Sequence, residues 1–202
     1  MYKNLLLYTY IVITVFCCTL FTSCKQDATP KPKAFLSLDY QEQEYAEYKN
    51  LKNYYAFEKN KIAEIKNVKD NSIEIHYPSM KATIFVNYKK VDNNLDKLLQ
   101  DAQKLTYEHF IKADEIIEQP YINPEDKVYG MFYNVQGDAA TNVQFYVTDS
   151  VKNFLVASLY FYAKPNFDSI LPAKDYIQKD MQHIIETLQW NRLEHLDLTN
   201  VD

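Results

Sequence analysis

Residues 154–163 read FLVASLYFYA, and this stretch decides the fold because it is apolar at almost every position. A strand with one wet face alternates apolar and polar residues, whereas a strand covered on both faces is apolar throughout. We therefore expect residues 154–163 to form a central, covered strand. An aromatic interface at Leu159–Tyr162 is the alternative interpretation of the same residues.

Two more strands are expected just before this one. Residues 142–148 put Val143, Phe145 and Val147 on one face, and residues 127–135 alternate aromatic side chains around Gly130. The links at 136–141 and 148–152 are short, so antiparallel hairpins are the natural connections.

The first half of the chain predicts further strands. Residues 72–77 alternate until Pro78 ends the run, and 80–88 place Met80, Ala82, Ile84, Val86 and Tyr88 on one face. Shorter signals predict a strand at 34–38, extended pieces turning at Asn60 within 54–66, and a strand at 115–122 followed by a turn at 123–126. The pattern at 39–53 does not decide between helix and strand.

Two segments have helical periodicity. Asn93 or Asn94 can cap the first, which we expect to run to about Ala113. The second is expected to start near Pro172, because proline suits the first turn of a helix. The residues expected to face a core are Leu95, Leu98, Leu99, Ala102, Leu105 and His109 in the first helix, and Tyr176, Ile177, Met181, Ile184, Ile185 and Leu188 in the second.

Together these elements predict an α+β domain with a largely antiparallel sheet covered by two main helices. Such a layered α/β sandwich is similar in its order of elements to the PsbP-like proteins.

The N-terminus is typical of an export signal. A short head with Lys3 precedes the apolar run LLLYTYIVITVFCCTLF at 5–21, and Thr22-Ser23-Cys24 is followed at once by polar residues. Small residues before a cysteine are the pattern of a bacterial lipoprotein signal, so we predict that Cys24 is acylated and begins the mature protein. An uncleaved membrane anchor is the alternative, since about 17 to 25 apolar residues can span a bilayer.

This interpretation divides the chain into four parts. Residues 1–23 are the signal peptide, 24–33 a lipidated tether with the sequence CKQDATPKPK, 34–190 a single globular domain, and 191–202 a flexible tail. The mature chain of 179 residues suits one domain with a sizeable core.

Composition excludes several kinds of function. The mature chain carries 21 Lys and Arg against 27 Asp and Glu, a net charge of −6, and so lacks the electrostatic footprint of a nucleic-acid binder. No cysteine follows Cys24, and only two glycines occur, so thiol chemistry in the domain and glycine-rich phosphate loops are excluded. We expect no cofactor.

Few residues suggest chemistry. His183 and Glu186 lie one helical turn apart, which fits a solvated ion pair better than half of a metal site. The loop at 136–141, with Gly137 and Asp138, is a possible contact loop, with an ordinary hairpin as the simpler interpretation. We find no catalytic or metal-binding motif.

Four strings carry a family resemblance: MKATIFVNYK at 80–89, NNLDKLLQDAQKLTYEHFIKAD at 93–114, EQPYINPEDKVYGMFYNVQGDAATNVQFYVTDS at 118–150, and FLVASLYFYAKPNFDSILPAKDYIQKDMQHIIETLQW at 154–190. With the acylated cysteine and the proline-bearing tether, these strings resemble the GldD gliding-motility lipoproteins of Bacteroidota.

The resemblance implies an accessory lipoprotein of the gliding machinery, which is coupled to the type IX secretion system. It implies no enzymatic activity, and only Cys24 carries over as a functional residue. The expected partners are the membrane, through the lipid on Cys24, and other envelope proteins, at the periplasmic face of the outer membrane or at the inner membrane. The rival hypothesis is a lipid-anchored enzyme or small-ligand binder that acts on envelope material.

Overall fold

The computed structural model describes Tyr2 and residues 40–49, 54–108, 113–137, 141–162 and 167–191. Apart from Tyr2, these residues belong to the second of two units into which the chain divides, Lys33–Asp202. The expected strand at 34–38, the tether and the tail after Asn191 lie outside the described residues.

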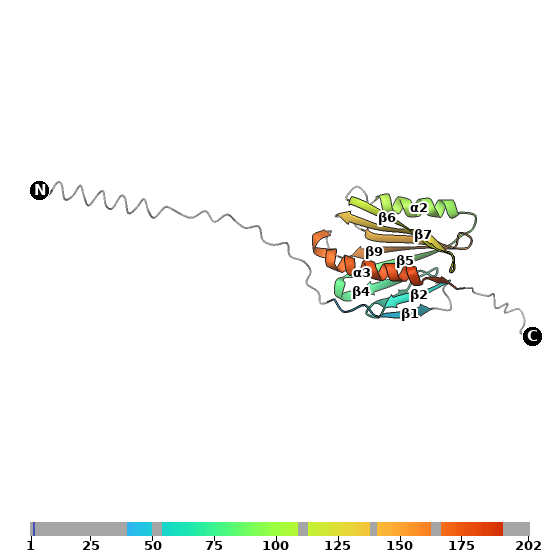
Figure 1. Cartoon of the computed structure of the whole chain (residues 1–202), viewed down its shortest axis with the longest axis horizontal. Coiled ribbons are helices and arrows are strands. Elements are labelled where there is room, and N and C mark those ends of the chain that lie inside the picture. The colour runs from blue at the N-terminus through green and yellow to red at the C-terminus, as the bar shows by residue number, and fades with distance from the viewer. Residues whose placement is uncertain are drawn as a thin grey trace, which may run out of the picture. The chain divides into compact units, whose positions relative to one another are not determined.

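A seven-stranded sheet forms the centre of this unit (Figure 1). All neighbouring strands pair antiparallel, as expected. The order across the sheet is β3 (Glu64–Asn67), β4 (Ile73–Tyr77), β5 (Ala82–Lys90), β9 (Asn153–Phe161), β8 (Thr141–Thr148), β7 (Val128–Gly137) and β6 (Ala113–Asn123). Most of the apolar stretch at 154–163 lies in β9, the fourth of the seven strands, and hairpins join β7, β8 and β9 in turn.

A smaller sheet contains β1 (Tyr45–Lys49), β2 (Tyr55–Asn60) and β10 (Gln189–Trp190), with β2 in the middle. The turn after Asn60 was expected. The pairing of β10 with β2 was not, because two residues are too few to give a strand pattern and their partner lies about 130 positions earlier in the chain.

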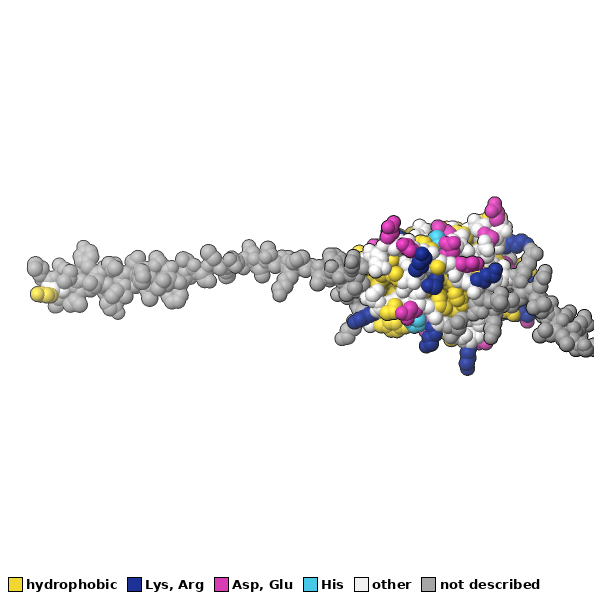
Figure 2. Space-filling view, turned by 90° about the horizontal axis from the view of Figure 1, so that it is seen from below, with side chains coloured by type: hydrophobic (Ala, Val, Ile, Leu, Met, Phe, Trp, Pro, Cys, Tyr) yellow, Lys and Arg dark blue, Asp and Glu magenta, His cyan; other side chains and the backbone are white. Residues whose placement is uncertain are grey.

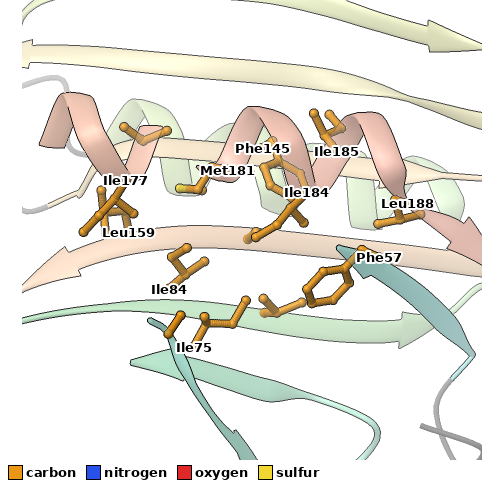
Figure 3. Close-up of a cluster of buried hydrophobic side chains, with 14 of the residues drawn as sticks. Phe57, Ile75, Ile84, Phe145, Leu159, Ile177, Met181, Ile184, Ile185 and Leu188 are labelled. Carbon is orange, nitrogen blue, oxygen red and sulfur yellow. The ribbon is translucent and has the colours of Figure 1, made fainter. Parts of the chain in front are cut away.

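Helix α3 (Phe167–Thr187) packs its apolar side on one face of the large sheet. Figure 3 shows Ile177, Met181 and Ile184 of α3 pointing at Leu159 and Ile84 of the sheet, with Phe57 of β2 beside Leu188. The six core-facing residues expected for this helix are all buried. The expected start at Pro172 is wrong, because α3 begins five residues earlier and proline lies inside it.

Helix α2 (Leu95–Glu108) packs with a second apolar cluster. Leu95, Leu98, Leu99 and Ala102 contact Tyr133, Tyr146 and Phe154 of the sheet. The expectation that this helix runs to Ala113 is wrong, since Ala113 is the first residue of β6. The β-branched Ile116, Ile117 and Ile122 and the aromatic Tyr121 favour the extended strand over a longer helix.

Alternation along β9 separates the two faces of the sheet. Leu155, Ala157 and Leu159 belong to the cluster with α3, whereas Phe154 and Val156 belong to the cluster with α2. Helix α3 and the small sheet share the first face. On the second face, the contacts of α2 with β6, β7, β8 and β9 leave the β5 side chain of Asn87 exposed to solvent.

Candidate functional site

A pocket of about 490 Å³ lies over β5 and β9, on the second face of the sheet. We call it the aromatic pocket. Antiparallel pairing sets Phe85 beside Ser158, and alternation brings Asn87 and Tyr160 to the same face. Its lining is Phe85, Asn87, Ser158, Tyr160, Phe161 and Tyr162.

Two contacts order the centre of the pocket, one between aromatic rings and one between polar side chains. The ring of Phe85 meets that of Tyr160 edge to face, with centroids 5.5 Å apart and planes at 80°. This is the arrangement that the quadrupoles of aromatic rings favour. Below them, the Ser158 hydroxyl donates to Oε1 of Gln144 at 3.1 Å, so its hydrogen is committed to the sheet.

A chain of hydrogen bonds, which we call the Tyr162 relay, holds the third ring. The Tyr162 hydroxyl donates to Oγ1 of Thr83 at 3.0 Å, and this oxygen lies 3.0 Å from Nδ1 of His76. Nε2 of His76 lies 2.9 Å from Oε2 of Glu74. Tyr162 is 63% exposed, yet its hydroxyl is bonded to β5 and, through Thr83, linked to His76 of β4.

The relay has the residue types of a hydroxyl–imidazole–carboxylate triad, but not a reactive arrangement. The side chain that would attack, Thr83, is completely buried and is the second residue of β5. A nucleophile must reach its substrate. The relay is therefore suited to positioning Tyr162, and the pocket to binding by stacking and hydrogen bonding.

A second polar group, the Asp180 cluster, lies under α3. Asp180 is completely buried, and its carboxylate accepts hydrogen bonds from four side chains. The donors are Gln43 and Tyr45 at 2.9 Å, Tyr77 at 2.9 Å, and Asn60, whose Nδ2 lies 3.2 and 3.0 Å from the two oxygens. The cluster joins α3 to β1, β2 and β4.

Burial controls the electrostatics of the Asp180 cluster. It raises the pKa of Asp180 above the ordinary value, although the hydrogen bonds from Tyr77, Asn60, Tyr45 and Gln43 oppose this. Burial and the neighbouring Asp180 carboxylate together raise the pKa of Tyr45 and of Tyr77, so both phenols stay protonated and act as donors.

The sequence suggested an ion pair between His183 and Glu186, but in the structure His183 pairs with Glu58 instead. Its Nε2 lies 2.7 Å from Oε2 of Glu58, and its ring stacks on Tyr45 with centroids 3.6 Å apart. Because helical neighbours are only one possible set of partners, the contact with β2 could not be inferred from spacing. Within the described ranges, no group of three or more His, Cys, Asp or Glu side chains could hold a metal ion.

The residues singled out from the sequence are distributed as follows. Gly137 is the last residue of β7, where it is buried, has φ 99°, and accepts a hydrogen bond from Nδ2 of Asn142 through its carbonyl. Asp138 and Cys24 lie outside the described residues, so the contact loop and the lipidation stay predictions. Leu159 is buried and Tyr162 exposed, so β9 is covered along most of its length and opens at its end.

Sequence reasoning missed Asp180, although a signal was present. Asp180 follows Ile177 by three positions and precedes Ile184 by four, so helical spacing puts it on the apolar side of α3. A carboxylate on such a stripe calls for buried donors.

Surface charge is mixed on the side drawn in Figure 2. Lys, Asp and Glu side chains are interspersed there, with hydrophobic areas between them. That side shows no extended basic face of the kind that nucleic-acid binders present. Over the described ranges, no helix combines the length and apolar character needed to cross a bilayer.

Comparison with known proteins gives two kinds of match. A family model described as "Gliding motility lipoprotein GldD" matches residues 25–190. Among solved structures, the solution structure of cyanobacterial PsbP (CyanoP) from Synechocystis sp. PCC 6803 aligns with 81% of this chain and 100% of that chain, at 10% identity and a TM-score of 0.46. No curated protein matches the chain.

Proposed function

Since the chain belongs to the GldD family of gliding motility lipoproteins, we propose that it is a non-catalytic module of the gliding machinery and of the type IX secretion system coupled to it. Membership makes it a lipid-anchored protein of the cell envelope. The module helps to assemble or stabilise these complexes through contacts with other envelope proteins.

The observation that carries this proposal is the family match, which covers the chain from Lys25 to Trp190. The mature protein is predicted to begin at Cys24, and the match starts at the next residue, Lys25. One acyl chain binds a membrane only marginally, whereas two or more hold a protein stably. We propose that acylated Cys24 holds the domain at the periplasmic face of the outer membrane.

The structure supports a binding role through what the aromatic pocket presents. Four of its six lining residues are aromatic, and with an exposed carboxamide and hydroxyl groups they can make contacts by stacking and hydrogen bonding. GldD is not a known enzyme family.

Gene deletion tests the proposal in the native host. Loss of the protein should impair surface spreading and the secretion of type IX substrates, and the wild-type gene supplied in trans should restore both. Levels of spreading and secretion equal to those of the parent strain would refute the proposed role.

A second candidate function is favoured by the aromatic pocket itself. Its volume of about 490 Å³ falls within the range of about 300–1,000 Å³ that small-ligand sites occupy. The anchored domain would then be a ligand binder for envelope material. Binding measurements on the purified lipoprotein distinguish this candidate from a module that contacts proteins alone.

A further inference from the structure

We propose that the aromatic pocket binds an uncharged pyranose ring of an envelope polysaccharide. The inference rests on the proposed function only for its location, because envelope anchoring is what brings glycan within reach. Everything else follows from the side chains of β4, β5 and β9 and the contacts between them.

The lining matches the two kinds of surface that a pyranose presents. The faces of the sugar ring carry C–H groups, which pack on aromatic rings, and its rim carries hydroxyl groups, which need donors and acceptors. Phe85, Tyr160 and Tyr162 supply the rings. Asn87 is exposed and offers both donor and acceptor.

Charge narrows the class of ligand. The six lining residues include no Lys, Arg, His, Asp or Glu. Among the strand partners of the lining residues, the charged one is Glu74, which pairs with Phe85 across β4 and β5. An anionic sugar would therefore find no counter-charge in the lining and would be repelled by this carboxylate. A neutral sugar carries no charge and needs no counter-charge.

The pocket is also preorganised, which a passive surface patch has no need to be. An exposed tyrosine ordinarily samples several rotamers, and fixing it on binding costs side-chain conformational entropy. Here the Tyr162 hydroxyl is already bonded to Thr83, and through it to His76 and Glu74. The side chains of His76 and Glu74 are only 29% and 22% exposed, so the far end of the relay is itself held by the sheet.

The contact between Phe85 and Tyr160 fixes the other two rings in the same way. Two separate devices thus hold three aromatic side chains around one open pocket. This is the arrangement expected where rings serve as a platform for a ligand, since each ring keeps its orientation when the ligand leaves.

Titration of the full-length lipoprotein in detergent micelles tests the proposal. The probes are tri-N-acetylchitotriose for amino-sugar polymers, and cellotriose and maltotriose for hexose polymers, followed by saturation-transfer NMR. We expect at least one of them to bind with Kd of about 1 mM, which corresponds to about −4 kcal/mol. The acidic trisaccharide 3′-sialyllactose should bind more weakly than the best neutral probe.

Variants assign the binding to the pocket. Tyr160→Ala and Tyr162→Ala should each raise the Kd at least about tenfold, while Tyr129→Ala, which truncates a half-buried tyrosine of β7 outside the pocket, should leave it unchanged. His76→Ala keeps all six lining residues but cuts the relay, and should raise the Kd by about threefold, well below the effect of losing a ring. Thermal unfolding confirms that each variant is folded.

Several outcomes would overturn the inference. One is no binding of any neutral probe at about 10 mM, a concentration about ten times the expected Kd. Another is equal binding by the wild type and both tyrosine variants. A third is a preference for the acidic sugar. Binding of a proline-rich peptide in place of the sugars would assign the pocket to a protein partner. None of these outcomes depends on the deletion phenotype, so failure of sugar binding and failure of the proposed function are separate results.

Discussion

The hydroxyl of Tyr45 donates a hydrogen bond of 2.9 Å to Oδ1 of Asp180, and so ties β1 to α3. Gln43, two residues earlier, bonds the same oxygen and also the backbone carbonyl of Tyr176. Gln43 and Tyr45 are thus attached to α3 through the buried Asp180 carboxylate and the Tyr176 carbonyl.

Replacing Asp180 should therefore destabilise the whole domain. Asp180→Ala leaves the buried donors Tyr77 and Asn60 and the half-buried Tyr45 without this acceptor, and we expect a loss of about 3 kcal/mol or more in the free energy of unfolding. Urea unfolding measures it. Glu186→Ala removes an exposed carboxylate from the same helix and should change the stability by less than about 0.5 kcal/mol. Equal effects of the two substitutions would contradict this role of the cluster.

The same carboxylate predicts a dependence on pH. Burial raises the folded-state pKa of Asp180 above the ordinary 3.8, so between these two values the folded protein holds a proton that the unfolded chain has released. Stability contributed by this group therefore rises as pH falls from neutral towards 3.8. In urea unfolding, the free energy of unfolding of the wild type should rise relative to that of Asp180→Asn as the pH falls over this range. A difference in free energy that does not change with pH would show that the pKa of Asp180 is not shifted.

Local patterns predicted most of the large sheet. The alternation at Ile73, Ile75, Ile84 and Val86 requires only that one face be dry, and an apolar run as long as β9 requires cover on both faces. The core side of α3 was predictable for the same reason. These features depend on neighbours in sequence.

Features set by distant partners could not be predicted. Strand β10 exists because Gln189 and Trp190 meet Ala56 and Tyr55, and no local signal announces such a pairing. Pro172 suggested a helix start because proline lacks the N–H that an interior position uses. The aromatic pocket depends on the register between β5 and β9, which places Phe85 beside Ser158.

Gly130 should not tolerate even a methyl group. A Cβ at this position of β7 would lie 1.9 Å from the backbone oxygen of Tyr146 on β8. Both atoms belong to paired strands and cannot move apart without breaking the ladder, so Gly130→Ala should cost about 3 kcal/mol. Urea unfolding of this variant checks the prediction, and a loss below about 0.5 kcal/mol would mean that β7 and β8 separate more easily than their pairing implies.

Asp149 should be needed for the hairpin between β8 and β9. Its Oδ1 accepts hydrogen bonds from the backbone N–H groups of Val151, Lys152 and Asn153 at 2.8–2.9 Å. Burial alone would raise the pKa of Asp149, but the bonds from Asn153, Lys152 and Val151 outweigh it and hold the pKa below the ordinary value.

Asp149→Ala should therefore lower the free energy of unfolding by about 2 kcal/mol at neutral pH. Because the folded-state pKa is lowered, this stabilisation is present above the unfolded value of 3.8 and is lost as pH falls through the folded value. The difference between wild type and variant should shrink in acid, opposite in sign to that at Asp180. Asp92→Ala, at an exposed turn position, is the control, and a loss as large there would point to a general effect of charge.

Acylation of Cys24 can be tested by mutation, with Cys17 and Cys18 as matched controls. Of the three cysteines, only Cys24 follows small residues and precedes polar ones, whereas Cys17 and Cys18 lie within the apolar run. Cys24→Ser should release the protein from washed membranes or block its processing, because without acyl chains no stable anchor is left. Cys17→Ser and Cys18→Ser should leave both membrane retention and the mass of the mature protein unchanged. Retention of the Cys24 variant through washing, with residues 1–23 still attached to the wild type, would instead establish an uncleaved membrane anchor.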